Sequence, residues 1–166
     1  NITHWRTQDI FGELLKTEVD GVLFTYYIHE PQTGNFQNLI NRGIPLVMID
    51  NIPAFGDYPS VLSNDINGGY IACRHLLSKG HKNILFITDE IEEYTQARRL
   101  EGYVRAVKES GLPSKSLKVL KVKGQLDLME KIRDMFKSGI QWDAVASISD
   151  GYVIDTYHVL KDMGIK

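Results

Sequence analysis

The stretch from residue 43 to residue 88 constrains the fold most, because it reads as strand, loop, helix and strand. Residues 46–49 are an unbroken apolar run, Leu-Val-Met-Ile, which is typical of a strand covered by helices on both faces. Asp50 follows this run directly, and residues 84–87 form a second apolar run. Two buried strands joined through a helix indicate a parallel α/β sheet.

A helix is predicted between these strands, over residues 65–79. Asp65 is expected to be its N-cap, and Gly80 the glycine that follows its last turn. One helical face carries mostly small side chains and is expected to approach a sheet closely; its members are Gly69, Ala72, Cys73 and Leu76.

The same alternation runs along the whole chain. Strands are expected at residues 22–26, 46–50, 83–88, 117–122 and 144–148, with a brief extended segment at 61–63. Helices are expected at 7–16, just before Gly43, and at 65–79, 96–110, 126–137 and 152–163. Four of these helices have predicted inward side chains. They are Phe36, Leu39 and Ile40 in the helix before Gly43; Leu100, Tyr103, Val104 and Val107 in 96–110; Met129, Ile132 and Phe136 in 126–137; and Val153, Tyr157 and Leu160 in 152–163.

The loop at residues 51–63 is rich in proline, glycine and polar residues and is expected to separate two lobes. We therefore expect residues 1–62 to belong to an N-terminal lobe and residues 63–166 to a C-terminal lobe. The chain opens on a helix and closes where another strand is due, so we expect a two-lobed α/β fold that is incomplete at both ends.

Composition excludes several classes of protein. The net charge of −2 provides no electrostatic reason for these residues to bind nucleic acid or an anionic membrane. No apolar run approaches the roughly 18 residues that a membrane helix needs. A single cysteine, Cys73, rules out an internal disulfide, and we expect it to be a small core residue in a reducing compartment.

Polar side chains follow the ends of several predicted strands, where open α/β sheets bind ligands. Asp50 can accept hydrogen bonds from two adjacent ligand hydroxyls, although a plain turn acid is the alternative. Arg99 can present its planar fork to a ligand, with Thr95 as the N-cap one turn earlier. The alternative for Arg99 is a surface ion pair, and neighbouring Arg98 is expected to be solvated.

At the end of the last strand, Asp150 is expected to cap the following helix, and Ser149 and Asp150 are candidate ligand contacts. His81 is interpreted as loop packing. The sequence contains no phosphate-binding loop, no nucleophile elbow and no dinucleotide-binding glycine motif. No cluster has the spacing of a metal site, so we expect neither a cofactor nor a metal and no enzymatic activity.

Several segments together resemble the effector-binding domain of LacI/GalR-type transcription regulators. They are Val19-Asp20-Gly21-Val22-Leu23, the strand ending at Asp50, Asp65 through Gly68-Gly69, Gly80-His81-Lys82-Asn83-Ile84, and Arg99-Leu100-Glu101-Gly102-Tyr103. The resemblance covers nearly the whole chain. It implies a periplasmic-binding-protein-like fold with a small ligand, usually a sugar, nucleoside or purine, between its lobes.

The resemblance also implies site residues and partners. Asp50 and Arg99 match ligand-lining positions, as do Thr95, Thr25 and Tyr26, and Ser149-Asp150 stands where the family often has Asn-Asp. It implies a cytoplasmic homodimer that reads operator DNA through an N-terminal helix-turn-helix absent from this sequence. The homodimer is expected to form partly through the helix at 65–79.

The alternative function is a periplasmic solute-binding protein of a transport system, which has the same fold without a DNA reader. An α/β hydrolase or kinase is a third hypothesis, which the absence of a catalytic constellation disfavours.

Overall fold

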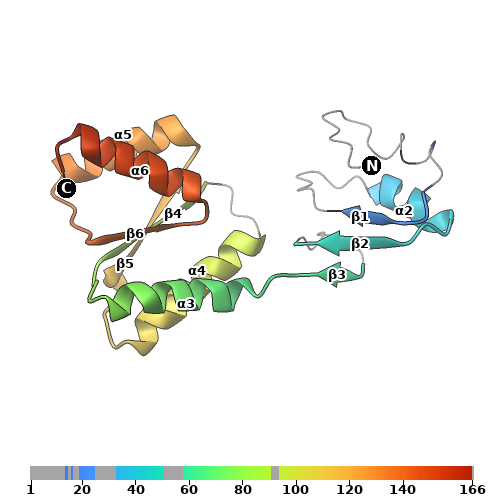
Figure 1. The fold of residues 1–166 in the computed structure, drawn as a ribbon, viewed down its shortest axis with the longest axis horizontal. Coiled ribbons are helices and arrows are strands. Elements are labelled where there is room, and N and C mark those ends of the chain that lie inside the picture. Colours follow the sequence, from blue (N-terminus) through green and yellow to red (C-terminus); the bar gives the residue numbers. More distant parts are fainter. Residues whose placement is uncertain are drawn as a thin grey trace. The chain divides into compact units, whose positions relative to one another are not determined.

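The computed structural model describes Leu14, Lys16 and residues 19–24, 33–50, 58–90 and 94–165, with helical residues 33–36 described by their backbone alone. The chain consists of two compact units, Asn1–Ser63 and Asn64–Lys166 (Figure 1). Both contain parallel strands with helices, which confirms the predicted α/β class.

The first unit contains a three-stranded parallel sheet in the order β1-β2-β3, with β2 in the centre. Its elements are β1 (Val22–Phe24), α2 (Thr33–Asn41), β2 (Leu46–Ile49) and β3 (Ser60–Val61). Phe24 of β1 pairs with Met48 of β2, and Met48 pairs in turn with Ser60 of β3. Apolar side chains from β1, α2 and β2 form the core: Phe24, Leu39, Leu46 and Met48.

Two expectations for this unit need correction. Leu46 and Met48 are buried, whereas Val47 and Ile49 are only partly covered, so the described part of the unit does not bury both faces of β2 equally. Ile40 was predicted to face inward but is 41% exposed. Among the described side chains of α2, Leu39 is the one that is buried in the core, because a short helix offers the sheet only a narrow stripe. The rest of the helix predicted at 7–16, beyond Leu14 and Lys16, and the Phe36 side chain lie outside the described residues.

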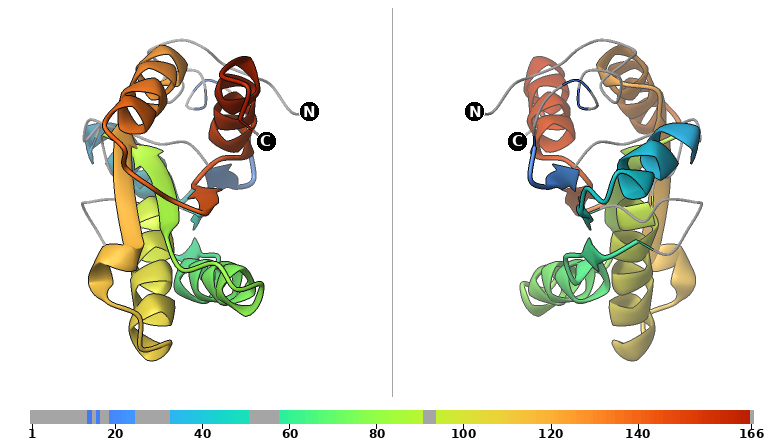
Figure 2. Two further views of the ribbon diagram at one scale, coloured as in Figure 1. Left: turned by 90° about the vertical axis from the view of Figure 1, so that its left-hand side faces the viewer. Right: turned by 90° about the vertical axis from the view of Figure 1, so that its right-hand side faces the viewer.

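The second unit is a three-layered structure around a parallel sheet in the order β5-β4-β6 (Figure 2). Its elements are α3 (Asp65–Ser78), β4 (Ile84–Asp89), α4 (Tyr94–Glu109), the short 3₁₀-helix η1 (Ser114–Ser116), β5 (Leu117–Val122), α5 (Gln125–Lys137), β6 (Ala144–Ser147) and α6 (Asp150–Asp162). The predicted alternation of strands and helices is confirmed, and the bounds of β5 agree residue for residue.

The central strand β4 is buried on both faces, and its side chains divide between two cores. Ile84 and Phe86 pack with α3 and α4, where the Phe86 and Tyr103 rings lie 4.7 Å apart. Leu85 and Ile87 pack with α5 and α6 on the opposite face. Helices on both sides of one parallel sheet therefore explain the unbroken apolar run in this strand.

Helices α3 and α4 pack directly on each other at two glycines. A Cβ built on Gly69 would collide with the backbone carbonyl oxygen of Arg99, and one built on Gly102 would lie 2.5 Å from the backbone nitrogen of Tyr70 and even closer to the Ile66 carbonyl oxygen. The small face of α3 was predicted to approach a sheet, and this is wrong in two respects. Gly69 faces α4 rather than a strand, and Ala72 is exposed.

The inward faces of three helices differ in part from the predicted ones. In α4, Tyr103 and Val107 are buried and Leu100 is partly buried, whereas Val104 is 52% exposed. The most buried side chains of α5 are Leu128, Ile132 and Met135, while Met129 and Phe136 are only partly covered.

In α6 the buried residues are Thr156 and Val159, whereas Val153 and Tyr157 are 38% and 61% exposed. Thr156 can be buried because its hydroxyl donates to the carbonyl oxygen of Tyr152 at 2.7 Å. A pattern that counts only apolar side chains misses such a satisfied polar residue.

Two interpretations of single residues agree with the structure. Cys73 is fully buried in the core between α3 and β4, and burial raises the pKa of its thiol to about 11. His81 lies in the turn before β4, with Nδ1 3.5 Å from Oδ1 of Asp143. The same carboxylate accepts hydrogen bonds from the backbone N–H groups of Lys82 and Asn83. Because Asp143 directly precedes β6, these bonds connect the turn to the start of that strand. No helix within the described ranges is long and apolar enough to cross a membrane.

Candidate functional site

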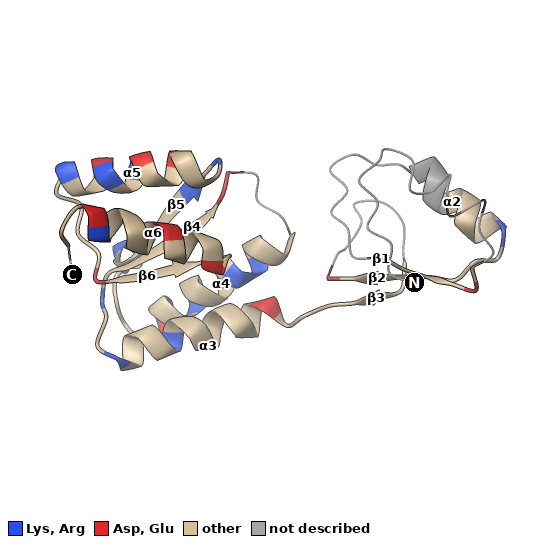
Figure 3. Ribbon diagram, turned by 45° about the horizontal axis from the view of Figure 1, so that its top comes forward, with Lys and Arg blue, Asp and Glu red and all other residues tan. Residues whose placement is uncertain are grey.

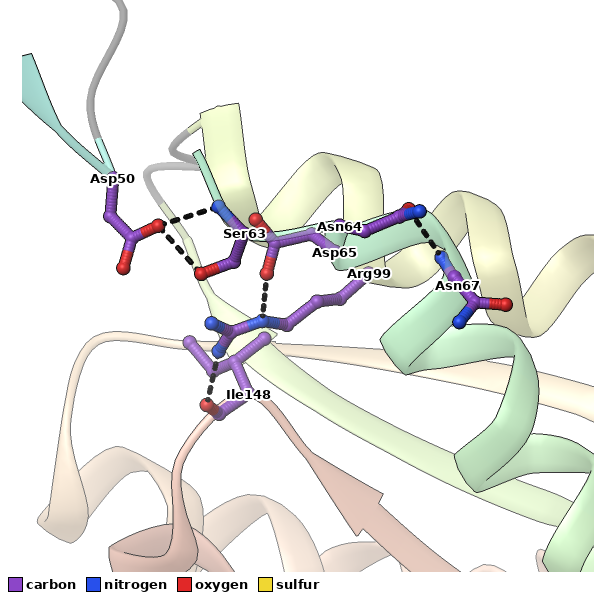
Figure 4. A network of polar contacts seen from close by, with 7 residues as sticks. All are labelled: Asp50, Ser63, Asn64, Asp65, Asn67, Arg99 and Ile148. Atoms are coloured by element: carbon purple, nitrogen blue, oxygen red, sulfur yellow. Dashed lines mark hydrogen bonds and ion pairs between the residues drawn. The ribbon is translucent and has the colours of Figure 1, made fainter. Parts of the chain in front are cut away.

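Arg99 is the best-organised charged side chain at the carboxyl end of the second sheet (Figure 4). Its Nε donates to Oδ1 of Asp65 at 2.7 Å, and its Nη1 donates to the carbonyl oxygen of Ile148 at 3.2 Å. The Asp65 side chain is 7% exposed, whereas that of Arg99 is 41% exposed. The guanidinium is therefore anchored at its inner side while its outer side reaches solvent.

The guanidinium of Arg99 has N–H donors that could still bind a ligand. An arginine has five N–H donors in a planar fork, of which two are used here. Within the part of the chain that the structure describes, no acceptor takes a hydrogen bond from Nη2. Arg99 is thus a fixed, partly exposed donor, the arrangement that planar recognition of a polar ligand requires.

The use of Asp65 by Arg99 corrects the prediction that Asp65 caps α3. Asn64 is the N-cap, and its Oδ1 accepts a hydrogen bond from the N–H of Asn67 at 3.1 Å. Asp65 is the first helical residue, and its carboxylate points to α4 instead of back to its own helix. The physical reason is that a buried carboxylate is stabilised more by a cation than by one further amide.

At the start of α6 the N-cap is Ser149 and not the predicted Asp150. The Oγ of Ser149 accepts a hydrogen bond from the N–H of Gly151 at 3.3 Å. Asp150, which was predicted to be the cap, is the first helical residue, and its Oδ1 accepts from the same N–H at 3.0 Å. Ser149 and Asp150 are the two residues after Ile148, whose carbonyl oxygen accepts a hydrogen bond from Arg99. The structure therefore brings them to the same edge of the sheet as Arg99.

Thr95 does not cap α4. The helix already begins at Tyr94, and Thr95 is only 5% exposed. Its role as a ligand contact stays a prediction. Arg98 is on the outer side of the same helix, 3.5 Å from Glu101 and with its guanidinium 5.7 Å from the centre of the Tyr94 ring, so it is largely solvated, as expected.

Asp50 directly follows β2 in the first unit, with a positive φ of 50°. Its Oδ1 accepts hydrogen bonds from the N–H and the hydroxyl of Ser63, at 2.8 and 2.7 Å (Figure 4). One role of this carboxylate is therefore to hold the segment after β3. That Asp50 and Arg99 bind one ligand stays a prediction, because each unit is described by itself. Thr25 and Tyr26 lie outside the described residues.

Three residues at the same edge of the second sheet were missed by the sequence analysis. Asp89 ends β4, and its carboxylate accepts hydrogen bonds from the hydroxyl of Tyr152 and from Nε2 of Gln96. Burial, followed by the hydrogen bond and the charge of Asp89, raises the pKa of Tyr152 to about 12, so its hydroxyl stays protonated. The rule that singled out Asp50, an acid at the end of an apolar strand, would also have found Asp89.

The described residues contain no group of three or more His, Cys, Asp or Glu side chains that could hold a metal ion. The site instead combines one anchored guanidinium with carboxylates, amides and hydroxyls. Such a set can orient a hydroxylated molecule by hydrogen bonds.

The family described as periplasmic binding proteins and sugar-binding domains of the LacI family matches residues 5–166. The chain is 31% identical over 103 residues to the transcriptional repressor PurR of Mannheimia succiniciproducens, an overlap that covers 62% of this chain and 30% of the repressor. It is 25% identical over 163 residues to catabolite control protein A of Priestia megaterium, which covers 94% of this chain and 47% of that protein.

A solved structure with a similar fold is a LacI family transcriptional regulator from Enterococcus faecium with bound ribose. It has a TM-score of 0.78 and 24% identity, over 95% of this chain and 58% of the regulator. CcpA of Lactococcus lactis has a TM-score of 0.72 and 17% identity, over 96% of this chain and 58% of that one. The chain thus spans about half, or less, of the length of the curated relatives described above.

Proposed function

Because the chain belongs to the family of periplasmic binding proteins and sugar-binding domains of the LacI family, we propose that it is the small-molecule-sensing part of a bacterial transcription regulator. Its effector is a sugar or a related hydroxylated molecule, and the chain itself performs no chemistry. The ribose bound to the similar Enterococcus faecium regulator supports this class of effector.

The observation that carries the proposal is the anchored Arg99. Asp65 and the carbonyl of Ile148 accept hydrogen bonds from Nε and Nη1, so the guanidinium is oriented before a ligand binds. A donor that is already fixed loses little conformational entropy on binding, which favours affinity. Ser149 and Asp150 lie beside Ile148 and are the further ligand contacts that we propose in this unit.

A regulator is favoured over the alternative, a solute receptor of a transport system, because the relatives named above are repressors and control proteins. The residues that precede this chain in the complete protein separate the two. A helix-turn-helix there supports the regulator and a cytoplasmic location, whereas a secretion signal contradicts both.

A thermal-shift screen of sugars, sugar phosphates and nucleosides on the full-length protein tests the sensing function. A ligand that binds only the folded state raises the free energy of unfolding by about 2.7 kcal/mol at a hundredfold excess over its Kd. We expect at least one hydroxylated compound to raise the melting temperature in a concentration-dependent way. A flat response to every compound would contradict the proposal.

We further propose that the regulator is a homodimer that binds operator DNA, with α3 contributing to the dimer contact. Ile71 on α3 is 58% exposed, so its side chain is accessible to a second copy of the chain. Sedimentation of the full-length protein at micromolar concentration is expected to show a dimer, and Ile71→Asp is expected to weaken it. A monomer under these conditions would disprove the dimer.

A further inference from the structure

The carboxylate of Asp89 is held by two uncharged groups at the carboxyl end of β4. The hydroxyl of Tyr152 donates to Oδ1, and Nε2 of Gln96 donates to Oδ2 at 2.9 Å. Gln96 is only 8% exposed, and its Oε1 accepts in turn from the hydroxyl of Thr88 at 3.3 Å. These bonds fix the position of the carboxylate without supplying a compensating positive charge.

Three of the described cations near this edge have acidic partners. Nζ of Lys131, which donates to the carbonyl oxygen of Lys121 in β5, lies 2.8 Å from Oδ2 of Asp127. Nε of Arg99 lies 2.7 Å from Oδ1 of Asp65, and Nζ of Lys123 lies 3.4 Å from Oε2 of Glu90. Across residues 58–90 and 94–165, no lysine or arginine forms an ion pair with Asp89. Asp89 and Asp150 are therefore acids of this edge without an ion-pair partner in these ranges, and Figure 3 shows red at the end of β4 and at the start of α6.

The start of α6 does not offset this charge. A helix N-terminus can attract an anion through its free N–H groups. Here the N–H of Gly151 donates hydrogen bonds to Oγ of Ser149 and to Oδ1 of Asp150. The Asp150 carboxylate also adds a negative charge at this helix end. An incoming phosphate would have to compete with that carboxylate.

The pKa of Tyr152, whose hydroxyl donates to Asp89, is also raised at this edge, in part by nearby negative charge. Burial raises the pKa of this phenol first, and the hydrogen bond to Asp89 and the negative charges of Asp89 and Asp155 raise it further. A second anion placed near this hydroxyl meets the same unfavourable potential. Like charges separated by less than the Debye length, about 8 Å at physiological salt, repel each other appreciably.

On the basis of the proposed function, we propose that this edge accepts uncharged, hydroxyl-rich ligands and rejects phosphorylated or carboxylated ones, and that Asp89 is the residue that rejects them. Two acceptor positions of the carboxylate are used by Tyr152 and Gln96, and about two more can accept ligand hydroxyls. Discrimination thus combines attraction for a hydroxyl with repulsion of an anion.

Calorimetry on the full-length protein with matched ligand pairs tests this inference. The pairs are ribose and ribose 5-phosphate, glucose and glucose 6-phosphate, and adenosine and adenosine 5′-monophosphate. For any pair whose neutral member binds, we expect the phosphorylated member to bind at least about tenfold more weakly at low salt, as Coulomb repulsion of this range predicts. Asp89→Asn, which keeps the shape and one acceptor oxygen, is expected to reduce that ratio severalfold.

Glu109→Gln is the matched control, since it removes an equal charge from an acid that binds Tyr70 and Arg105 on the outer surface of α3 and α4. It is expected to leave the ratio unchanged. The unmodified protein gives a further test. Raising the salt concentration is expected to reduce the ratio between its affinities for the neutral and the phosphorylated ligand.

A phosphorylated ligand that binds as tightly as its neutral parent overturns this inference and leaves the proposed sensing function intact. A ratio that neither salt nor Asp89→Asn changes also overturns the role of Asp89. If no member of these pairs binds, the compound identified by the thermal-shift screen and its phosphate form the deciding pair, and a flat screen overturns the proposed function together with this inference.

Discussion

Replacing Gly69 with alanine is expected to lower the free energy of unfolding of the second unit by about 3 kcal/mol or more. The new Cβ would collide with the carbonyl oxygen of Arg99, and its contacts to the carbonyl carbon and Cα of that residue would be only 2.9 and 3.0 Å. These are backbone atoms of a packed helix, so the collision can be relieved only by moving α3 away from α4. Gly102→Ala is expected to do the same from the other side.

Gly68 is the control for this prediction, because it precedes Gly69 in the same helix. A Cβ added there meets nothing within 4 Å. Gly68→Ala is therefore expected to stabilise α3 by roughly 0.5–1 kcal/mol through helix propensity alone. Urea denaturation followed by circular dichroism measures all three variants. Similar stabilities of the Gly68 and Gly69 variants would contradict the close helix contact.

Substitution of Arg99 is expected to weaken effector binding by about 10- to 150-fold. This range corresponds to a hydrogen bond from a charged group, worth roughly 1.5–3 kcal/mol, at about 1.4 kcal/mol per factor of ten. Both Arg99→Lys and Arg99→Ala are expected to weaken effector binding. An ammonium keeps the positive charge beside Asp65 but cannot donate in one plane to Asp65, Ile148 and a ligand.

Arg98→Ala is the internal control, since Arg98 is 44% exposed and contacts surface Glu101 and the ring of Tyr94. Its removal is expected to change affinity little. Arg99→Ala also leaves Asp65, whose side chain is 7% exposed, without its cation, so calorimetry must be done at a temperature where every variant is folded. Loss of binding in the Arg98 variant but not in the Arg99 variants would show that the wrong arginine is assigned.

The order and type of the helices and strands can be predicted from the sequence, because their signals are local. The apolar run at 84–87, the glycines after helix ends and the helical spacing of apolar residues act over a few positions. The strand β5 agrees with its prediction at both ends. The candidate Arg99 was also accessible from sequence, through its place early in a helix and the family resemblance.

The roles of adjacent polar residues depend instead on contacts between distant parts of the chain. Asn64 rather than Asp65 caps α3, because Asp65 is bound by Arg99, a residue 34 positions away. Asp89 acquires its place in the site from Tyr152, 63 positions away. Local patterns carry no information about such distant partners.

The contact between α3 and α4 illustrates the same limit for packing. The sequence indicates a small face around Gly69, but Gly69 lies against α4 near the second glycine, Gly102, rather than against a strand. A small side chain permits close approach by any neighbour, and the fold alone selects which neighbour approaches. In α6, likewise, the position of the helix on the sheet decides that Thr156 is buried and Val153 is not. Hydrophobic periodicity does not predict this, because the Thr156 hydroxyl is satisfied by a hydrogen bond within its own helix.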